Sequence, residues 1–175
     1  MRRVARAERV RGFSHDARRT GMECLRGVVD MIIGLDHVAI TTPCIDRLLP
    51  FYRDLLGLTV VKEMSWDGDA EAADRILGLS KTRVRQVKVA GPGVLIEIWE
   101  FREPRGRAAD PDRPMCDAGL AHFCFRVDDL QAFYDRLVAA GVRFHCPPQT
   151  FAAGQSATYA RDPDGNIVEF QQPPR

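Results

Sequence analysis

Apolar and polar positions divide the first half of the chain into short strands around one helix. Apolar residues recur at helical spacing over residues 45–56, and Gly57 then marks the helix end. Pro50 lies inside this segment and removes a backbone donor, so we expect an irregular first turn and a regular helix from about Pro50. The turn composition of residues 91–93 separates two of the predicted strands. The strands are predicted at 32–41, 58–63, 83–90 and 94–101.

The second half repeats this order of elements. A strand is predicted over 120–127, followed by Asp128 as helix N-cap, a helix with a periodic apolar face, and Gly141 as its end. Further strands are predicted over 142–145, 157–161 and 166–171. Each half therefore has the pattern βαβββ, and the predicted fold class is α+β.

A sequence repeat supports this division. Residues 34–40 return as residues 119–125, and each copy later ends on a glutamate between apolar residues. The first half has 13 extra residues between its histidine and its glutamate, which we place near 66–81, where 70–77 reads as an added helix. Two histidines and two glutamates at matching places are the inventory of a metal site built by duplication. These residues are His37 and Glu97 in the first half, and His122 and Glu169 in the second.

The alternation of side chains along a strand puts these four residues on one kind of face. Because neighbouring residues of a strand point to opposite sides, Glu97 lies opposite Ile96 and Ile98. By the same rule, the other three residues lie on the opposite face of their strands from large apolar side chains that can pack on a helix. Glu100 falls on the face of Ile96 and Ile98, so we prefer Glu97 as the functional residue.

Composition and charge narrow the class of protein. Residues 1–30 hold eight arginines and four acidic residues, and we predict a basic, disordered arm there, followed by one domain over residues 31–175. The whole chain has a net charge of +1, which offers no argument for binding nucleic acid or an anionic membrane. No apolar run approaches the roughly 20 residues of a membrane-spanning helix. Five cysteines without a CxxC pair favour a reducing, cytoplasmic location.

Four motifs together resemble the vicinal oxygen chelate superfamily, which includes glyoxalase I, methylmalonyl-CoA epimerase, extradiol dioxygenases, and fosfomycin- and bleomycin-resistance proteins. The resemblance covers roughly residues 32–172. It implies two βαβββ modules, at about 32–103 and 118–172, whose mixed sheets curve into a cup around one divalent metal. The motifs are residues 35–40, residues 51–58, residues 119–122 continuing into 127–130, and residues 161–170.

The resemblance also implies roles for the repeated residues. The ligand positions of the glyoxalase I and epimerase branches correspond to His37, Glu97, His122 and Glu169. Imidazole and carboxylate ligands suit zinc, nickel, cobalt, manganese or iron, and four protein ligands leave two of six positions for vicinal oxygens of a substrate. By the same resemblance, Glu169 is the expected base in proton transfer next to a carbonyl, the reaction of an isomerase or lyase.

The sequence is also compatible with two other function classes. A non-haem iron dioxygenase would use two histidines and one carboxylate, and a resistance protein would bind a drug or transfer a thiol to it. We expect a small oxygenated organic acid or carbonyl compound as the substrate. The 13 extra residues of the first half and residues 102–117 are the expected places for specificity. A homodimer is expected, with the cup closed either within one chain or across the dimer.

Overall fold

The computed structural model describes residues 32–174, so the predicted arm lies outside the described residues. The chain divides into two units, Met1–Asp36 and His37–Arg175. In the first unit, residues 32–36 form no helix or strand. The prediction of a strand from residue 32 is therefore wrong in its first part. This strand begins at Val38 because pairing with its neighbour starts at the Val38–Ile96 register.

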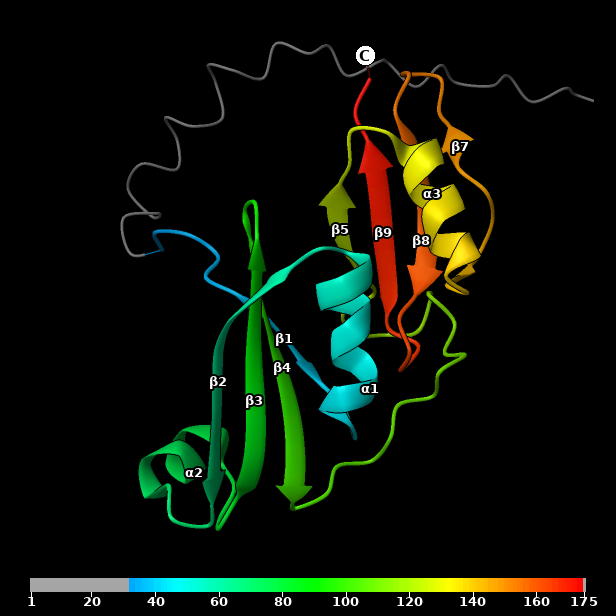
Figure 1. Cartoon of the computed structure of the whole chain (residues 1–175). Coiled ribbons are helices and arrows are strands. Elements are labelled where there is room, and N and C mark those ends of the chain that lie inside the picture. The colour runs from blue at the N-terminus through cyan, green and yellow to red at the C-terminus, as the bar shows by residue number, and fades with distance from the viewer. Residues whose placement is uncertain (1–31, 175) are drawn as a thin grey trace, which may run out of the picture. The chain divides into compact units, whose positions relative to one another are not determined.

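The first module of the second unit forms a mixed sheet of four strands, in the order β1-β4-β3-β2 (Figure 1). β1 runs parallel to β4, and the other neighbours are antiparallel. The β2–β3 hairpin is longer than predicted, and the predicted extra helix lies between these strands as α2 (Glu71–Leu77). The strands of this first sheet are β1 (Val38–Thr41), β2 (Thr59–Asp67), β3 (Arg83–Gly91) and β4 (Val94–Glu103).

The second module repeats the plan in a second mixed sheet. Its order is β5-β9-β8-β6, with the short β7 also pairing to β8, and β5 runs parallel to β9. Helix α3 (Leu130–Ala139) packs on β9 (Figure 1). The α+β class with two βαβββ modules is thereby confirmed, and β7 is an addition that the sequence pattern did not predict. The strands are β5 (Phe123–Arg126), β6 (Arg143–Phe144), β7 (Gln149–Thr150), β8 (Ser156–Arg161) and β9 (Ile167–Gln172).

The order of the regular and irregular helical turns around Pro50 is the reverse of the prediction. The regular part, α1 (Ile45–Pro50), comes first, and a π-helical turn, η1 (Phe51–Leu55), follows it. Pro50 has no N–H to donate to the Asp46 carbonyl, and the turn after it is closed by the wider hydrogen bond from the Leu56 N–H to the Phe51 carbonyl at 3.0 Å.

The N-cap of α3 is also one residue later than predicted. The Asp129 side chain accepts a hydrogen bond from the Ala132 N–H at 3.0 Å and is the cap. Asp128 instead accepts from the N–H of Asp129. Two adjacent aspartates offer the same capping chemistry, so only the backbone conformation distinguishes them.

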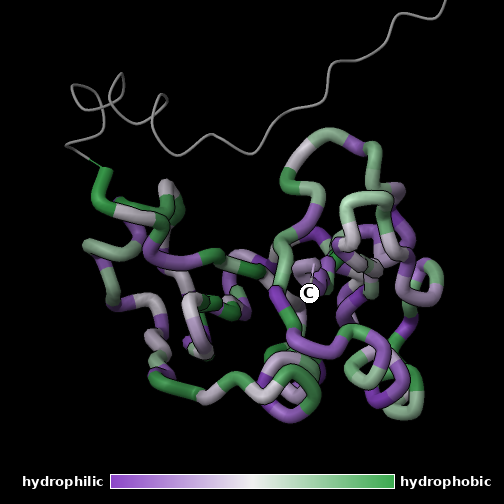
Figure 2. The backbone as a smooth tube through the Cα atoms, turned by 90° about the horizontal axis from the view of Figure 1, so that it is seen from above, coloured by the Kyte–Doolittle hydropathy of each residue, from purple (hydrophilic) through white to green (hydrophobic). Residues whose placement is uncertain are grey.

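One hydrophobic core joins the two modules within the second unit. Hydrophobic and hydrophilic stretches alternate along the backbone (Figure 2). The buried hydrophobic residues of α1, η1 and strands of both sheets form one cluster. The Tyr52 ring stacks on Phe123 at 6.4 Å between centroids. Buried core residues from both modules are Ile45, Leu48, Tyr52, Ile96, Ile98, Leu130, Leu137, Val168 and Phe170.

A buried hydrogen bond fixes the same junction. The Tyr52 hydroxyl donates to Asp162 Oδ2 at 2.7 Å, and the amides of Asp164 and Asn166 donate to the other carboxylate oxygen at 2.9 Å each. Burial raises the pKa of Asp162, although these hydrogen bonds oppose the rise. The turn between β8 and β9 requires Gly165, where φ is +87° and an added Cβ would meet Pro111 Cα at 2.3 Å.

The Tyr52→Phe variant should test how much this junction contributes to stability. It keeps the aromatic ring but leaves a buried carboxylate with one donor fewer, so we expect the free energy of unfolding to fall by about 1–3 kcal/mol. Urea denaturation followed by circular dichroism would measure it. Tyr134→Phe is the matched control, because the described residues offer its hydroxyl no hydrogen-bond partner. Equal losses in the two variants would contradict the assignment.

Candidate functional site

The first histidine–glutamate pair lies at the edge of the first sheet. His37 directly precedes β1, and Glu97 lies on the neighbouring parallel strand β4, in register with Ala39. His37 Nε2 and Glu97 Oε2 are 3.5 Å apart. The Glu97 side chain is only 5% exposed, whereas that of His37 is 37% exposed. The imidazole therefore remains accessible beside a buried carboxylate.

Glu97 has several further partners on β3 and β4. Gln86 Nε2 donates to its Oε2 at 2.8 Å, and Trp99 Nε1 donates to the same oxygen at 3.0 Å. Lys88 forms an ion pair with Oε1 from the register position directly across β3. Burial raises the pKa of Glu97, but the hydrogen bonds from Lys88 and Trp99 and the charge of Lys88 outweigh it and lower that pKa. Glu97 is thus a firmly held carboxylate.

The second pair has the same placement in the second sheet. His122 directly precedes β5, Glu169 lies on the parallel strand β9, and His122 Nε2 is 3.0 Å from Glu169 Oε2. Tyr159, across β8, takes the place that Lys88 has in the first module. Desolvation and the charge of Glu169 raise the pKa of the Cys124 thiol to about 12, and the same causes raise the pKa of Tyr159. Both groups therefore stay protonated at neutral pH beside Glu169.

The side chains across the sheet were not identified from the sequence. Alternation alone would have placed Gln86 and Lys88 on one face of their strand, but their position opposite Glu97 depends on the register of the β3–β4 hairpin. Tyr159 required the corresponding register of β8 and β9. Such registers are set by turn geometry and bulges, which the sequence pattern indicates only loosely.

The donors of each pair suit a divalent metal. Metal bonds of 2.0–2.2 Å put neighbouring ligand atoms about 3 Å apart, which is close to the separations in both pairs. His122 Nδ1 is buried without a hydrogen-bond partner, so the polar contact of this imidazole is the one from Nε2 to Glu169. Within residues 32–174, however, no three or more histidine, cysteine, aspartate or glutamate residues form a metal-binding group. The structure brings the four predicted residues together as two pairs and does not unite the pairs.

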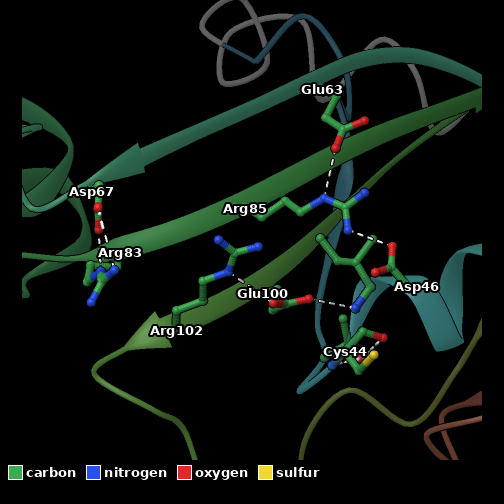
Figure 3. Close-up of polar contacts among 10 residues, drawn as sticks. Cys44, Asp46, Glu63, Asp67, Arg83, Arg85, Glu100 and Arg102 are labelled. Atoms are coloured by element: carbon green, nitrogen blue, oxygen red, sulfur yellow. Dashed lines mark hydrogen bonds and ion pairs between the residues drawn. The ribbon is translucent and has the colours of Figure 1, made fainter.

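Glu100 has a structural contact on the other face of β4. Its carboxylate accepts from the Ile45 N–H at the start of α1 at 2.9 Å and also pairs with Arg102 (Figure 3). On the same face, Arg85 binds both Glu63 and Asp46, the latter from α1 (Figure 3). The prediction that Glu100 lies on the helix-facing side is confirmed. The face that carries Glu97, opposite α1, is called the inner face below.

Other predicted features have limited roles at the two pairs. His145 lies beside Tyr159, with ring centroids 6.2 Å apart, and burial together with Arg161 and Arg143 lowers its pKa. Among the described cysteines, Cys44, Cys116, Cys124 and Cys146 are free thiols. No helix in residues 32–174 is both long and apolar enough to cross a membrane.

Comparisons with known proteins agree with the architecture. The chain is 28% identical over 146 residues to an ethylmalonyl-CoA/methylmalonyl-CoA epimerase from Cereibacter sphaeroides, covering 81% of this chain and 99% of that protein. It is 27% identical over 145 residues to a 2-epi-5-epi-valiolone epimerase from an Actinomyces species, covering 79% and 78%.

A solved structure and a family model extend this likeness. A glyoxalase family protein from Bacillus cereus superimposes with a TM-score of 0.74 at 21% identity, over 82% of this chain and 96% of that one. This likeness shows the fold. The family model for the glyoxalase/bleomycin resistance protein/dioxygenase superfamily matches residues 34–170, which include both modules and both pairs. The chain therefore belongs to the glyoxalase/bleomycin resistance protein/dioxygenase superfamily.

Proposed function

We propose that this protein is a divalent-metal-dependent enzyme that moves a proton at a carbon next to a carbonyl group, as an epimerase or related isomerase. The observation that carries the proposal is the repeated pair, in which each imidazole Nε2 lies 3.0–3.5 Å from a glutamate oxygen at equivalent places in the two modules. The names of the two relatives support epimerisation in particular. A small carbonyl compound or an acyl thioester is the substrate class that fits this proposal.

His37, Glu97, His122 and Glu169 are the residues proposed to hold the metal. Bound there, a divalent cation would act as a Lewis acid on vicinal oxygens of the substrate. Because the described residues of one chain present these donors as separate pairs, we propose that the first pair of one copy meets the second pair of another. A homodimer would then contain two equivalent sites, each made of residues from both chains.

Glu169 is the proposed base. Its side chain is 13% exposed, and its neighbours Cys124 and Tyr159 are protonated donors that do not compete for the substrate proton. Glu97, in contrast, is neutralised by the Lys88 ammonium and held by two further donors. The better solvated and less strongly paired carboxylate is the one free to take a proton from carbon and return it.

Metal content tests the ligand set. We expect about one divalent ion per chain in the wild type and at least a tenfold weaker metal affinity in His122→Ala and Glu97→Ala, because each substitution removes a ligand. Elemental analysis after dialysis, with calorimetric titration of zinc and nickel, would measure both quantities. His145→Ala is the control, since His145 contacts Tyr159 and lies outside the proposed ligand set. Unchanged metal content in both ligand variants would refute the site.

Mixing two variants that each lack one metal ligand tests whether the site is shared between chains. His37→Ala keeps the second pair and His122→Ala keeps the first, so a mixed dimer should regain one complete site. After dissociation and random reassociation we expect about a quarter of the wild-type metal content, because half of the dimers are mixed and each has one intact site of two. Metal content no higher than that of the separate variants would place each complete site within one chain.

Isotope exchange tests the reaction. In deuterated solvent, the wild type should exchange the hydrogen next to the carbonyl of a 2-hydroxycarbonyl or branched acyl-thioester substrate, measured by proton NMR. Glu169→Gln should slow this exchange by about 10²- to 10⁴-fold, the usual contribution of a general base. Oxygen uptake without exchange would instead favour a dioxygenase. Binding of the compound with neither signal would favour a sequestering protein.

A further inference from the structure

Three rows of side chains cross the inner face of the first sheet. They follow from the register of β2 with β3 and of β3 with β4, in which directly opposite residues share a face. The hydrogen bonds and ion pair to Glu97 from Gln86, Trp99 and Lys88 show that this is the face of the first pair. The rows are Lys62–Lys88–Glu97, then Met64–Gln86–Trp99, then Trp66–Val84–Phe101.

The first row carries an excess of positive charge. Lys88 pairs with Glu97, which balances one ammonium, whereas Lys62 is exposed and has no ion-pair partner among residues 32–174. The Lys88 side chain is 24% exposed, so its remaining N–H groups can still be reached from solvent. Two ammonium groups beside a single carboxylate complement one further anionic group.

The third row and Trp99 form an apolar surface next to this charge. The Trp99 ring meets Trp66 edge-on at 5.9 Å and stacks with Phe101 at 5.8 Å between centroids. The indole N–H groups are both bound, that of Trp66 to Thr82 Oγ1 at 2.7 Å and that of Trp99 to Glu97 Oε2 at 3.0 Å. These bonds fix the orientation of two half-buried rings, which suits them to packing against a flat apolar group.

We propose that the inner face of the first sheet binds an aromatic 2-hydroxy or 2-oxo acid. Its carboxylate would contact Lys62 and Lys88, and its ring would pack on Trp99, whose ring is held by its contacts with Trp66 and Phe101. Successive rows lie about 7 Å apart along the strands, a separation comparable to that between the carboxylate and the ring in such acids. The oxygen on the second carbon then lies near His37 and Glu97. The reaction at that carbon rests on the proposed function, but the binding does not.

Tryptophan fluorescence gives a direct test, because the chain has two tryptophans and both belong to this surface. The full chain would be titrated with 3-phenyllactate, with lactate, which lacks the ring, and with 3-phenyl-1,2-propanediol, which lacks the charge. We expect a saturable change in emission, with a Kd for phenyllactate at least tenfold lower than for either analogue. Equal affinity for phenyllactate and the diol, or calorimetric binding without a change in emission, would overturn the proposal.

Charge variants locate the contact. Lys62→Gln and Lys88→Gln should each raise the Kd of phenyllactate by about tenfold, because each removes a charge-assisted contact. Lys62 is exposed and unpaired, so its variant tests the proposal even if Lys88→Gln fails to fold. Arg83→Gln is the matched control, because it removes a positive charge from β3 on the opposite face, where Arg83 pairs with Asp67 (Figure 3). Unchanged affinity in Lys62→Gln would contradict the assignment.

The same titration separates this proposal from the proposed function. It would be repeated on His122→Ala, whose substitution lies in the second module and removes no residue of the three rows. Retained phenyllactate binding, with metal content unchanged in both His122→Ala and Glu97→Ala, would refute the metal site and leave this surface supported. If His122→Ala loses metal as expected and neither protein responds to phenyllactate, the proposed binding surface is wrong and the metal site is unaffected.

Discussion

The alternation of side chains along buried strands is the constraint on which this site depends. Ile96 and Ile98 are fully buried against the core, as are Val168 and Phe170. Each such side chain contributes about 1.5–3 kcal/mol on burial, so a register that reversed these faces would lose several times that amount. The carboxylates of Glu97 and Glu169 are thereby forced onto the opposite face. The chemistry of the site follows from the packing of residues that take no part in it.

The features predictable from the sequence are those that this periodicity governs. The periodicity of apolar residues predicted the two βαβββ modules, the added helix at 70–77, and the faces on which Glu97 and Glu100 lie. Features set by local hydrogen-bond competition were harder to predict, as the π-helical turn after Pro50 and the cap at Asp129 show. The partners across the sheet depend on hairpin register. The separation of the two pairs depends on how the modules pack, which no local pattern encodes.

The two halves of the repeat have diverged in their electrostatics. In the first module a lysine lies across the sheet from the glutamate, and in the second a tyrosine does. An ammonium neutralises its carboxylate, whereas a phenol donates a hydrogen bond and leaves the negative charge in place. Under the proposed function, this difference gives the first half a holding role and the second a reactive one. A single substitution on the neighbouring strand is enough to change this balance.

The added helix α2 lies between β2 and β3, at the end of the hairpin remote from the Glu97–Lys88 row. The register opposite Glu97 is instead anchored by the turn at residues 91–93 between β3 and β4. Growth or loss of residues around α2 therefore leaves the donor positions where they are. A foreign peptide could be displayed there while the strands that carry Glu97 and Lys88 keep their register.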